Sequence, residues 1–239
     1  MSHFFSALAF LTIIPVPKTA AWDDGRMALY FPVVGLLVGC LLCGFDFLCG
    51  RFAGSEMLAI LDVLFLAFIS GGLHLDGLAD AADGLLAHRP REKTLEIMRD
   101  QRIGAMGALA LIFCVLMKYA AIRELVEGNR WIWLLAAPAF ARTAQVAGLA
   151  LTDYARKDGG IGENLFQRKK FRLLLFSPAA AVIPFFIGTE AGMQALLLFL
   201  IVTAAFFSFC GKRIGGMTGD TIGALSEIVE TCVLVLGGL

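Results

Sequence analysis

Long apolar stretches, separated by short polar segments, run through the chain from residue 28 to its end. A helix that crosses a membrane needs about 20 consecutive, mainly apolar residues. The pattern predicts about seven spanning helices, at Ala28–Cys49, Met57–Leu75, Gly104–Ile122, Trp131–Leu151, Leu173–Ile187, Met193–Cys210 and approximately Thr221–Leu239. The stretch before Met193 is the shortest and contains two prolines, which favours a kinked or partly re-entrant helix.

The N-terminal apolar segment differs from these stretches. It extends from Phe4 to Ile14 and ends at Pro15 and Pro17. It is too short to cross a hydrocarbon core about 30 Å thick as a helix, and no basic region precedes it as in a cleavable signal peptide. We therefore expect an interfacial or re-entrant segment here.

The composition also indicates a membrane protein. Of the 239 residues, 59% are hydrophobic and 17% are charged, whereas soluble domains average about 45–50% and 25%. The formal net charge is zero, so overall charge suggests no nucleic-acid partner. Because no linker, low-complexity tract or internal repeat divides the chain, we expect one all-α, polytopic membrane domain over residues 1–239.

Basic residues are unequally divided between the two sides that the predicted spans define. Fifteen of the 20 Lys and Arg residues fall in loops on one side, and only Arg51, Arg123 and Arg130 fall in loops on the other. Cytoplasmic loops of membrane proteins carry such an excess of positive charge. The pattern therefore predicts that the basic side is cytoplasmic.

The most distinctive segment lies where the second predicted span meets the basic side. Residues 71–84 read Gly-Gly-Leu-His-Leu-Asp-Gly-Leu-Ala-Asp-Ala-Ala-Asp-Gly. On a helix, the spacing of Asp76, Asp80 and Asp83 places three carboxylates on one face. Like charges at such short distances destabilise the fold unless a cation lies among them. The alternative is a solvated helix start whose acidic residues interact with the helix dipole.

Two further polar segments fall on the same predicted side. In the cluster Met98–Gly104, Arg99 is a candidate substrate ligand, and Asp100 and Arg102 are candidates for catalytic roles. A glycine-rich turn before the last span ends at Asp220 and holds candidate substrate ligands, Lys212, Arg213, Gly215, Gly216, Thr218 and Gly219. Such a turn offers backbone N–H groups to a phosphate. We expect these segments and the aspartates to converge on one site.

Three other features have more than one interpretation. His74 is either a general base or a hydrogen-bonding spacer. Glu227 and Glu230 in the last span are expected to pair with Arg142, and such a pair could serve only to fix helix register. The basic run Arg168–Arg172 is expected to bind either anionic membrane lipid or substrate phosphates.

Clustered carboxylates, basic side chains and a glycine-rich turn together favour Mg²⁺ and a phosphate or diphosphate. Mg²⁺ binds oxygen ligands, keeps several waters and is shared with substrate phosphates. Phosphoryl transfer depends mainly on positioning and charge neutralisation. The sequence holds no Walker A motif and no convincing Ser-His-Asp arrangement. The residues therefore predict a Mg²⁺-dependent transferase that acts on a phosphate-bearing substrate.

Residues 71–84 closely resemble the signature of the cobalamin-5'-phosphate synthase family. Shorter blocks that also resemble it extend along the chain, at Phe10–Pro17, Tyr30–Gly35, Glu96–Gly104 and Gly215–Ala224. The resemblance implies a polytopic enzyme of the cell inner membrane that uses Mg²⁺. It also implies the reaction, a late step of cobalamin biosynthesis in which α-ribazole or its 5'-phosphate is joined to adenosylcobinamide-GDP and GMP is released.

The resemblance implies roles for several of the candidate residues. A ribose hydroxyl of ribazole would attack the phosphorus that stays with cobinamide, while the three aspartates of residues 71–84 hold Mg²⁺ on the diphosphate. Asp220 would complete a second metal site or orient the nucleophile. His74 or Asp100 would accept the hydroxyl proton. Basic side chains would offset the charge on the leaving GMP, namely Arg102, Lys212 and Arg213.

Two other classes of membrane protein remain open at this point. One is a CDP-alcohol phosphotransferase or prenyltransferase, although CDP-alcohol enzymes place Arg after the Ala of their first motif, where Asp80 stands here. The other is a cation-coupled transporter, which favours acidic residues near the midplane and inverted repeats. The sequence does not indicate an oligomeric state.

Overall fold

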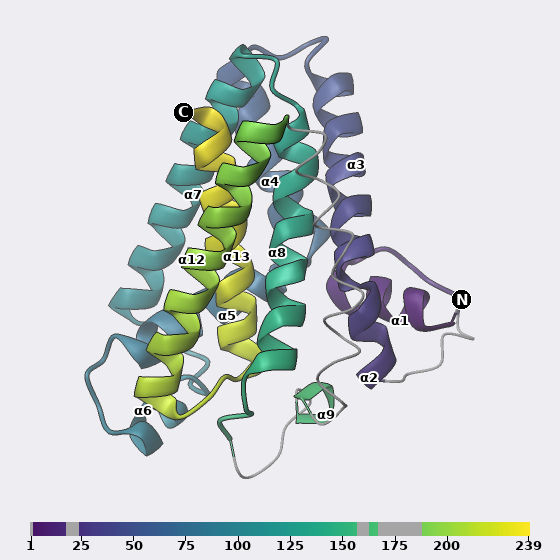
Figure 1. Cartoon of the computed structure of the whole chain (residues 1–239). Helices are drawn as coiled ribbons and strands as arrows, with labels where there is room; N and C mark the ends of the chain where they lie inside the picture. The colour runs from purple at the N-terminus through teal and green to yellow at the C-terminus, as the bar shows by residue number, and fades with distance from the viewer. Residues whose placement is uncertain (1, 18–23, 157–162, 167–187) are drawn as a thin grey trace.

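The computed structural model describes residues 2–17, 24–156, 163–166 and 188–239 (Figure 1). Its helices, in chain order, are α1 (Ser2–Leu11), α2 (Asp24–Met27), the 3₁₀ helix η1 (Ala28–Tyr30), α3 (Phe31–Cys49), α4 (Ser55–Ile69), α5 (Leu73–Leu85), α6 (Arg91–Ile97), α7 (Ala105–Glu127), α8 (Ile132–Leu151), α9 (Glu163–Phe166), α12 (Thr189–Ile214) and α13 (Gly219–Gly238). The predicted all-α class is confirmed.

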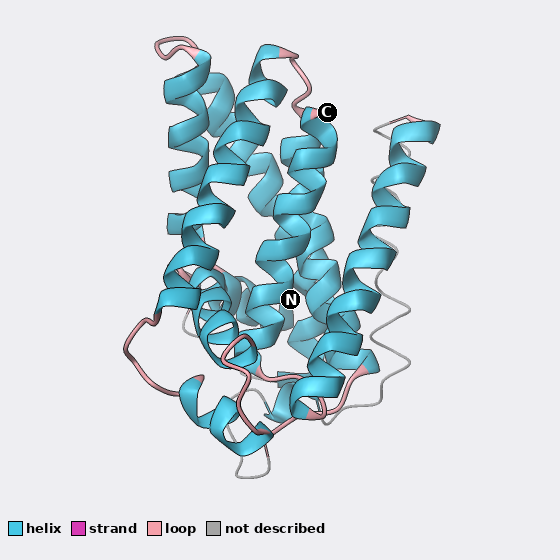
Figure 2. Ribbon diagram, turned by 90° about the vertical axis from the view of Figure 1, so that its left-hand side faces the viewer, coloured by secondary structure: helices cyan, strands magenta, loops and turns pink. Residues whose placement is uncertain are grey.

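Five segments in the described part of the chain are long and apolar enough to cross a membrane, namely η1 with α3, α7, α8, α12 and α13. Figures 1 and 2 show these helices side by side along a common direction. The pair α4 and α5 is a sixth candidate, bent by 86°. A multi-pass helical protein is therefore confirmed. The predicted span Leu173–Ile187 lies outside the described residues, as does the basic run Arg168–Arg172.

The short helix α1 packs against the first spanning helix. Its ten residues are fewer than a membrane crossing needs. The ring of Phe10 stacks on that of Phe31 with centroids 5.9 Å apart, and Leu11 is buried. The chain therefore begins beside the lower end of α3 in Figure 1, and its position relative to a membrane surface stays a prediction.

The centre of the bundle is α8, which is buried along most of its length. It approaches α3 closely because α3 presents glycines to it. A Cβ atom at Gly35 would lie 2.5 Å from the Pro138 carbonyl oxygen, and one at Gly39 would lie 2.3 Å from that of Leu135. Small residues four positions apart allow such backbone contact between membrane helices.

The chain bends sharply between α4 and α5. The sequence predicts one continuous span over Met57–Leu75, and that prediction is wrong, because α4 ends at Ile69 and α5 starts at Leu73 at a steep angle. Gly71 and Gly72 have φ of 60° and 74°, a left-handed conformation that glycine adopts without steric cost. The bend lays the aspartate-bearing helix against α7 and α13 instead of continuing α4.

A buried ion network joins α7, α8 and α13. Lys118 Nζ lies 2.6 Å from Glu227 Oε2 and 2.7 Å from Glu230 Oε1. The predicted pairing of Arg142 is confirmed, because its guanidinium donates to Glu230. All four side chains are almost inaccessible, and their charges cancel. Lys118 is the member of this network for which the sequence offered no partner.

Candidate active site

The polar segments singled out in the sequence gather at one end of the bundle. In Figure 1, α6, the lower end of α8, α9 and the turn between α12 and α13 all lie at this lower end, opposite the C-terminus. Helix α5 reaches the same region and packs against α13 and α7. The aspartates of α5 and the turn before Asp220 therefore lie in the same region of the bundle.

Helix α5 meets the start of α13 backbone to backbone. A Cβ atom at Gly77 would lie 2.8 Å from the Asp220 carbonyl oxygen and 3.2 Å from its Cα atom. The carboxylate of Asp80 consequently lies within the electrostatic influence of three others, those of Asp76, Asp220 and Asp83. The two acidic segments, which are far apart in the sequence, thus form one cluster.

Replacing Gly77 by Ala is expected to destabilise the protein by about 1–3 kcal/mol, because the added methyl group overpacks a backbone contact that cannot yield without moving a helix. The matched control is Gly44→Ala on α3, where the methyl group would meet nothing within 4 Å and should stabilise the helix by up to about 1 kcal/mol. Thermal unfolding of both variants in one detergent is the measurement. Equal stability of the two variants would contradict the contact.

Asp83 has a structural role in addition to its predicted one. Its carboxylate accepts the N–H of Gly104 at 2.7 Å and that of Gly107 at 2.8 Å, and so caps the N-terminus of α7. A carboxylate oxygen has two lone pairs, so these bonds still leave acceptor capacity. The role of Asp83 as a metal ligand stays a prediction, weaker in geometry than that of Asp76 or Asp80.

Asp220 is held by a residue that the sequence analysis did not single out. Arg156 Nη2 lies 2.7 Å from Asp220 Oδ2, and the Thr218 hydroxyl lies 3.3 Å from the same oxygen. Arg156 follows α8 in a loop that pairs with the glycine-rich turn, since Met217 N donates to Asp153 O and Ala155 N donates to Met217 O, both at 2.8 Å. A single arginine in a basic loop carries no sequence signal that distinguishes it.

Backbone conformation and close backbone contacts require glycine at two positions of this turn. Gly215 has φ of 76° and ends α12, and a Cβ atom at Gly216 would lie 2.3 Å from the Asp153 carbonyl oxygen. Thr218 and Thr221 form a capping box that engages the N–H groups of both residues. A phosphate at this helix start would therefore use the N–H groups of Gly219 and Asp220. Phosphate binding by the turn stays a prediction.

Two basic side chains stabilise the architecture around the site. Arg213 donates two hydrogen bonds, of 3.0 and 2.8 Å, to the carbonyl of Leu85 at the end of α5. Arg91 donates to the carbonyls of Ile214 and Ala155. Arg213 is thus engaged as a helix cap, whereas Lys212 is exposed and keeps its predicted role of meeting substrate charge.

Asp100 and Arg102 form a solvent-exposed pair in the loop before α7. Arg102 Nη2 lies 2.6 Å from Asp100 Oδ2, and these hydrogen bonds lower the pKa of Asp100 to about 2, below its ordinary value. A carboxylate with so low a pKa is a weak proton acceptor near neutral pH. His74, the other predicted proton acceptor, lines the cavity beside the acidic cluster. Arg99 is exposed in the same loop.

A cavity of about 360 Å³ opens beside the acidic cluster, lined by Phe10, Phe31, Leu73, His74, Asp76, Gly77, Gln145, Leu149, Tyr154, Arg156, Leu165, Phe166, Gly219, Asp220, Ile222 and Gly223. It contains His74 and both acidic segments, and its polar atoms sit beside aromatic and aliphatic walls. Drug-sized and cofactor-sized ligands occupy cavities of this kind. We take it, with Asp80, as the candidate active site.

The carboxylates fit a Mg²⁺ ion that is shared with substrate. In the described part of the chain, no three His, Cys, Asp or Glu side chains converge tightly enough to enclose an ion by themselves. Mg²⁺ usually takes only one or two carboxylates and completes its shell with water and substrate phosphate oxygens. Asp76 is exposed and Asp80 is half-buried, and the repulsion at Asp80 would be relieved by a cation.

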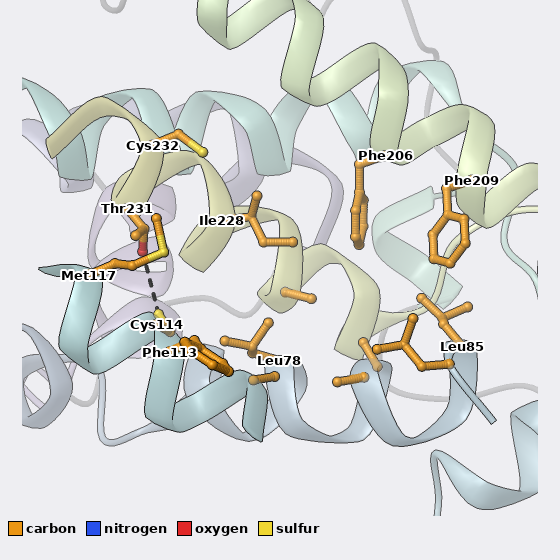
Figure 3. Close-up of a pocket in the computed structure, with 15 residues that line it drawn as sticks. Leu78, Leu85, Phe113, Cys114, Met117, Phe206, Phe209, Ile228, Thr231 and Cys232 are labelled. Atoms are coloured by element: carbon orange, nitrogen blue, oxygen red, sulfur yellow. Dashed lines mark hydrogen bonds between the residues drawn. The ribbon is translucent and has the colours of Figure 1, made fainter. Parts of the chain in front are cut away.

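A larger cavity of about 440 Å³ lies on another side of α5 (Figure 3). Figure 3 shows apolar and sulfur-containing side chains from α5, α7, α12 and α13 directed into it, among them Leu78, Leu85, Phe113, Cys114, Met117, Phe206, Phe209, Ile228 and Cys232. Thr231 is its one hydroxyl and contacts Cys114 Sγ at 3.4 Å. Because no charged side chain is among its lining residues, we do not expect phosphate chemistry in this cavity.

Comparison with known proteins gives a consistent result. The sequence pattern of the family described as cobalamin-5-phosphate synthase matches residues 3–238. A relative from Syntrophobacter fumaroxidans is 38% identical over 240 residues, covering 98% of this chain and 96% of the relative. One from Pseudomonas syringae pv. syringae is 37% identical over 247 residues, covering 98% of each chain. Both are named adenosylcobinamide-GDP ribazoletransferase. No solved structure matches the chain.

Proposed function

The chain belongs to the cobalamin-5-phosphate synthase family, and from this premise we propose that it transfers α-ribazole, or its 5'-phosphate, to adenosylcobinamide-GDP and releases GMP. The shared name of the relatives supports these substrates. Family membership also favours this activity over the CDP-alcohol phosphotransferase, prenyltransferase and cation-coupled transporter classes that the sequence left open. We further propose that the reaction depends on Mg²⁺ and occurs on the cytoplasmic side of the cell inner membrane.

One observation supports the location of the reaction more than any other. The backbone contact between Gly77 and Asp220 brings the carboxylates of α5 and α13 together beside Arg156. Transfer from a diphosphate needs a place where negative charge is neutralised and the reacting groups are held in line. Asp76, Asp220 and Arg156, which all line the 360 Å³ cavity, would provide that combination.

The proposed reaction forms one P–O bond and breaks another. A ribose hydroxyl of ribazole attacks the phosphorus attached to cobinamide, the bond from this phosphorus to the oxygen of GMP breaks, and the hydroxyl proton is released. Asp76, Asp80 and Asp220 would hold Mg²⁺, which supplies charge neutralisation on the diphosphate. Arg156 and Lys212 would attract the phosphate groups, and His74 would accept the hydroxyl proton.

The direct test is GMP release by purified protein in detergent. We expect release only when adenosylcobinamide-GDP, α-ribazole and Mg²⁺ are all present. Omission of each component in turn is the control. GMP release that does not require ribazole would indicate a hydrolase, and release that survives removal of divalent cations would exclude the proposed dependence on Mg²⁺.

Replacing Asp80 by Asn tests the metal site. The change keeps the size of the side chain and removes one anionic ligand, so we expect GMP release to fall by about 10²-fold and the Mg²⁺ concentration for half-maximal rate to rise. Folding should be unaffected, because removing one of several crowded charges relieves repulsion. The control Glu124→Gln removes a half-exposed charge on α7 and should change neither quantity. An unchanged Mg²⁺ requirement in the Asp80 variant would remove Asp80 from the metal site.

Membrane orientation is tested with reporter fusions. Fusions after His88 and after Lys212 are expected to report a cytoplasmic location, and fusions after Arg51 and after Gly128 the opposite side, because the basic loops fall at the end of the bundle that carries the site. Alkaline phosphatase and green fluorescent protein provide complementary signals. Opposite locations for His88 and Lys212 would contradict a single site at one end.

A further inference from the structure

The cavity beside the acidic cluster is lined by two kinds of side chain. Asp76, Asp220 and Arg156, the residues assigned above to the diphosphate, line it and keep access to solvent; we call this charged part of the lining its rim. Its interior is mainly apolar and aromatic, with walls from four parts of the chain, namely Phe10 on α1, Phe31 on α3, Leu149 on α8 and Ile222 on α13. Diphosphate chemistry alone gives no reason for an apolar chamber behind the charged rim.

The interior also contains polar atoms without partners. Gln145, one turn before Leu149 on α8, is 2% exposed, and its Oε1 atom has no hydrogen-bond partner among the described residues. The same holds for both ring nitrogens of His74, which is also 2% exposed. Buried polar groups in folded proteins are nearly always hydrogen-bonded. Two such side chains lining one cavity therefore indicate that a bound molecule supplies their partners.

The geometry points to this chamber as the site for the heteroaromatic base of the ribazole nucleoside, with the Gln145 amide as its hydrogen-bonding partner; this inference rests on the proposed function. A benzimidazole ring is flat and largely apolar, and once attached to ribose it has one ring nitrogen free to accept a hydrogen bond. Because an amide carries both donors and an acceptor, the Gln145 –NH2 group can donate to that nitrogen while its unpartnered Oε1 atom accepts from a ribose hydroxyl of the same nucleoside.

The guanine of the other substrate fits the chamber less well. Its ring carries several donors and acceptors, each of which loses hydrogen bonds to water on burial and needs a replacement. The interior polar side chains are His74 and Gln145, whereas phenylalanine and aliphatic side chains form most of the surrounding wall. A chamber with few polar groups therefore favours the benzimidazole ring over guanine.

This placement also orients the nucleophile. With the base against Gln145 and Leu149, the ribose lies toward the rim, where His74, Asp76 and Asp220 line the same cavity. The attacking hydroxyl then approaches the diphosphate from the chamber side, and the leaving GMP departs on the outer side of the acidic cluster. Gln145 acts as a positioning residue in this arrangement and takes no part in proton transfer.

The test combines a variant with a modified substrate. Gln145→Leu is compared with wild type by GMP release, using α-ribazole and the indole riboside of the same shape, in which a C–H group replaces the acceptor nitrogen. We expect wild type to have about a tenfold higher KM for the indole analogue. Gln145→Leu should have about the same raised KM for both acceptors, with kcat and the KM for adenosylcobinamide-GDP nearly unchanged.

The control variant is Thr143→Val on the same helix. Thr143 is also buried, its hydroxyl donates to Ala139 O at 2.8 Å, and it does not line the cavity. This variant should keep the wild-type preference for α-ribazole over the indole analogue. A loss of preference in Thr143→Val equal to that in Gln145→Leu would overturn the assignment to Gln145.

The remaining outcomes separate the two proposals. Absence of GMP release by wild type contradicts the proposed function itself. An active wild type that uses both acceptors with equal KM overturns the base site, and this comparison does not require any variant to fold. A Gln145→Leu variant whose KM rises for adenosylcobinamide-GDP instead of α-ribazole would place guanine or the corrinoid in the chamber.

Discussion

Asp76→Ala and Asp220→Ala are each expected to slow GMP release by about 10³-fold or more, and the double variant is expected to be little slower than the poorer single variant. Residues that act as one unit in a reaction give grossly non-additive losses. The measurement is GMP release by the two single variants and the double variant, at saturating Mg²⁺ and in the same detergent.

The expectation follows from how α5 and α13 meet. Asp76 precedes Gly77, whose backbone touches that of Asp220, and the two carboxylates line the same cavity. If both act on one diphosphate, removing either leaves the reacting phosphorus without complete charge neutralisation. Removing the second carboxylate then causes little further loss of rate, because the first change has already abolished most of the activity.

The comparison of the single and double variants needs two controls. Asp220 accepts hydrogen bonds from Arg156 and Thr218, so its loss can also weaken the start of α13 by about 1 kcal/mol; thermal stability of the variants must therefore be matched. Glu96→Ala removes an exposed carboxylate near the same end and should leave GMP release within about twofold of wild type. Losses that add to within about 0.5 kcal/mol would instead indicate two independent sites.

The long helices could be predicted because each membrane span is a continuous run of apolar residues in the sequence. That signal does not mark the bend between α4 and α5, since the apolar run continues across it and two adjacent glycines permit a left-handed turn without requiring one. The bend was therefore missed, although it determines which helices α5 contacts. A hydropathy pattern gives the length of a helix but not its direction relative to the next.

In the candidate site, too, local features could be predicted from the sequence and tertiary contacts could not. Helical spacing is a local property, so the shared face of Asp76 and Asp80 could be read from the sequence. The contact of α5 with Asp220, the pairing of Arg156 and the capping of α5 by Arg213 are tertiary contacts between distant segments. Nothing within each segment encodes these partners, so a list of charged residues could not rank Arg156 above its neighbours.

The buried ion network gives the second large expectation, on stability. Glu230→Leu is expected to destabilise the protein by about 3–5 kcal/mol, because it leaves Arg142 without its carboxylate and Lys118 with one of two, and an uncompensated buried charge is costly. The control is Glu124→Leu on α7, whose half-exposed pair with Arg123 should contribute less than about 1 kcal/mol. Thermal unfolding in detergent measures both.

The double variant Arg142→Met with Glu230→Leu tests whether the ion network serves only stability or also the reaction. It removes one positive and one negative charge, so the remaining Lys118–Glu227 pair stays neutral, and replacing a buried ion pair by apolar side chains is often neutral or stabilising. We therefore expect the double variant to recover most of the lost stability. If the network only fixes the register of α7, α8 and α13, GMP release should recover with the folded fraction. A stable double variant without GMP release would instead show that Arg142 or Glu230 also contributes to the reaction, and His74, whose imidazole lies within their electrostatic influence, would be the next residue to replace.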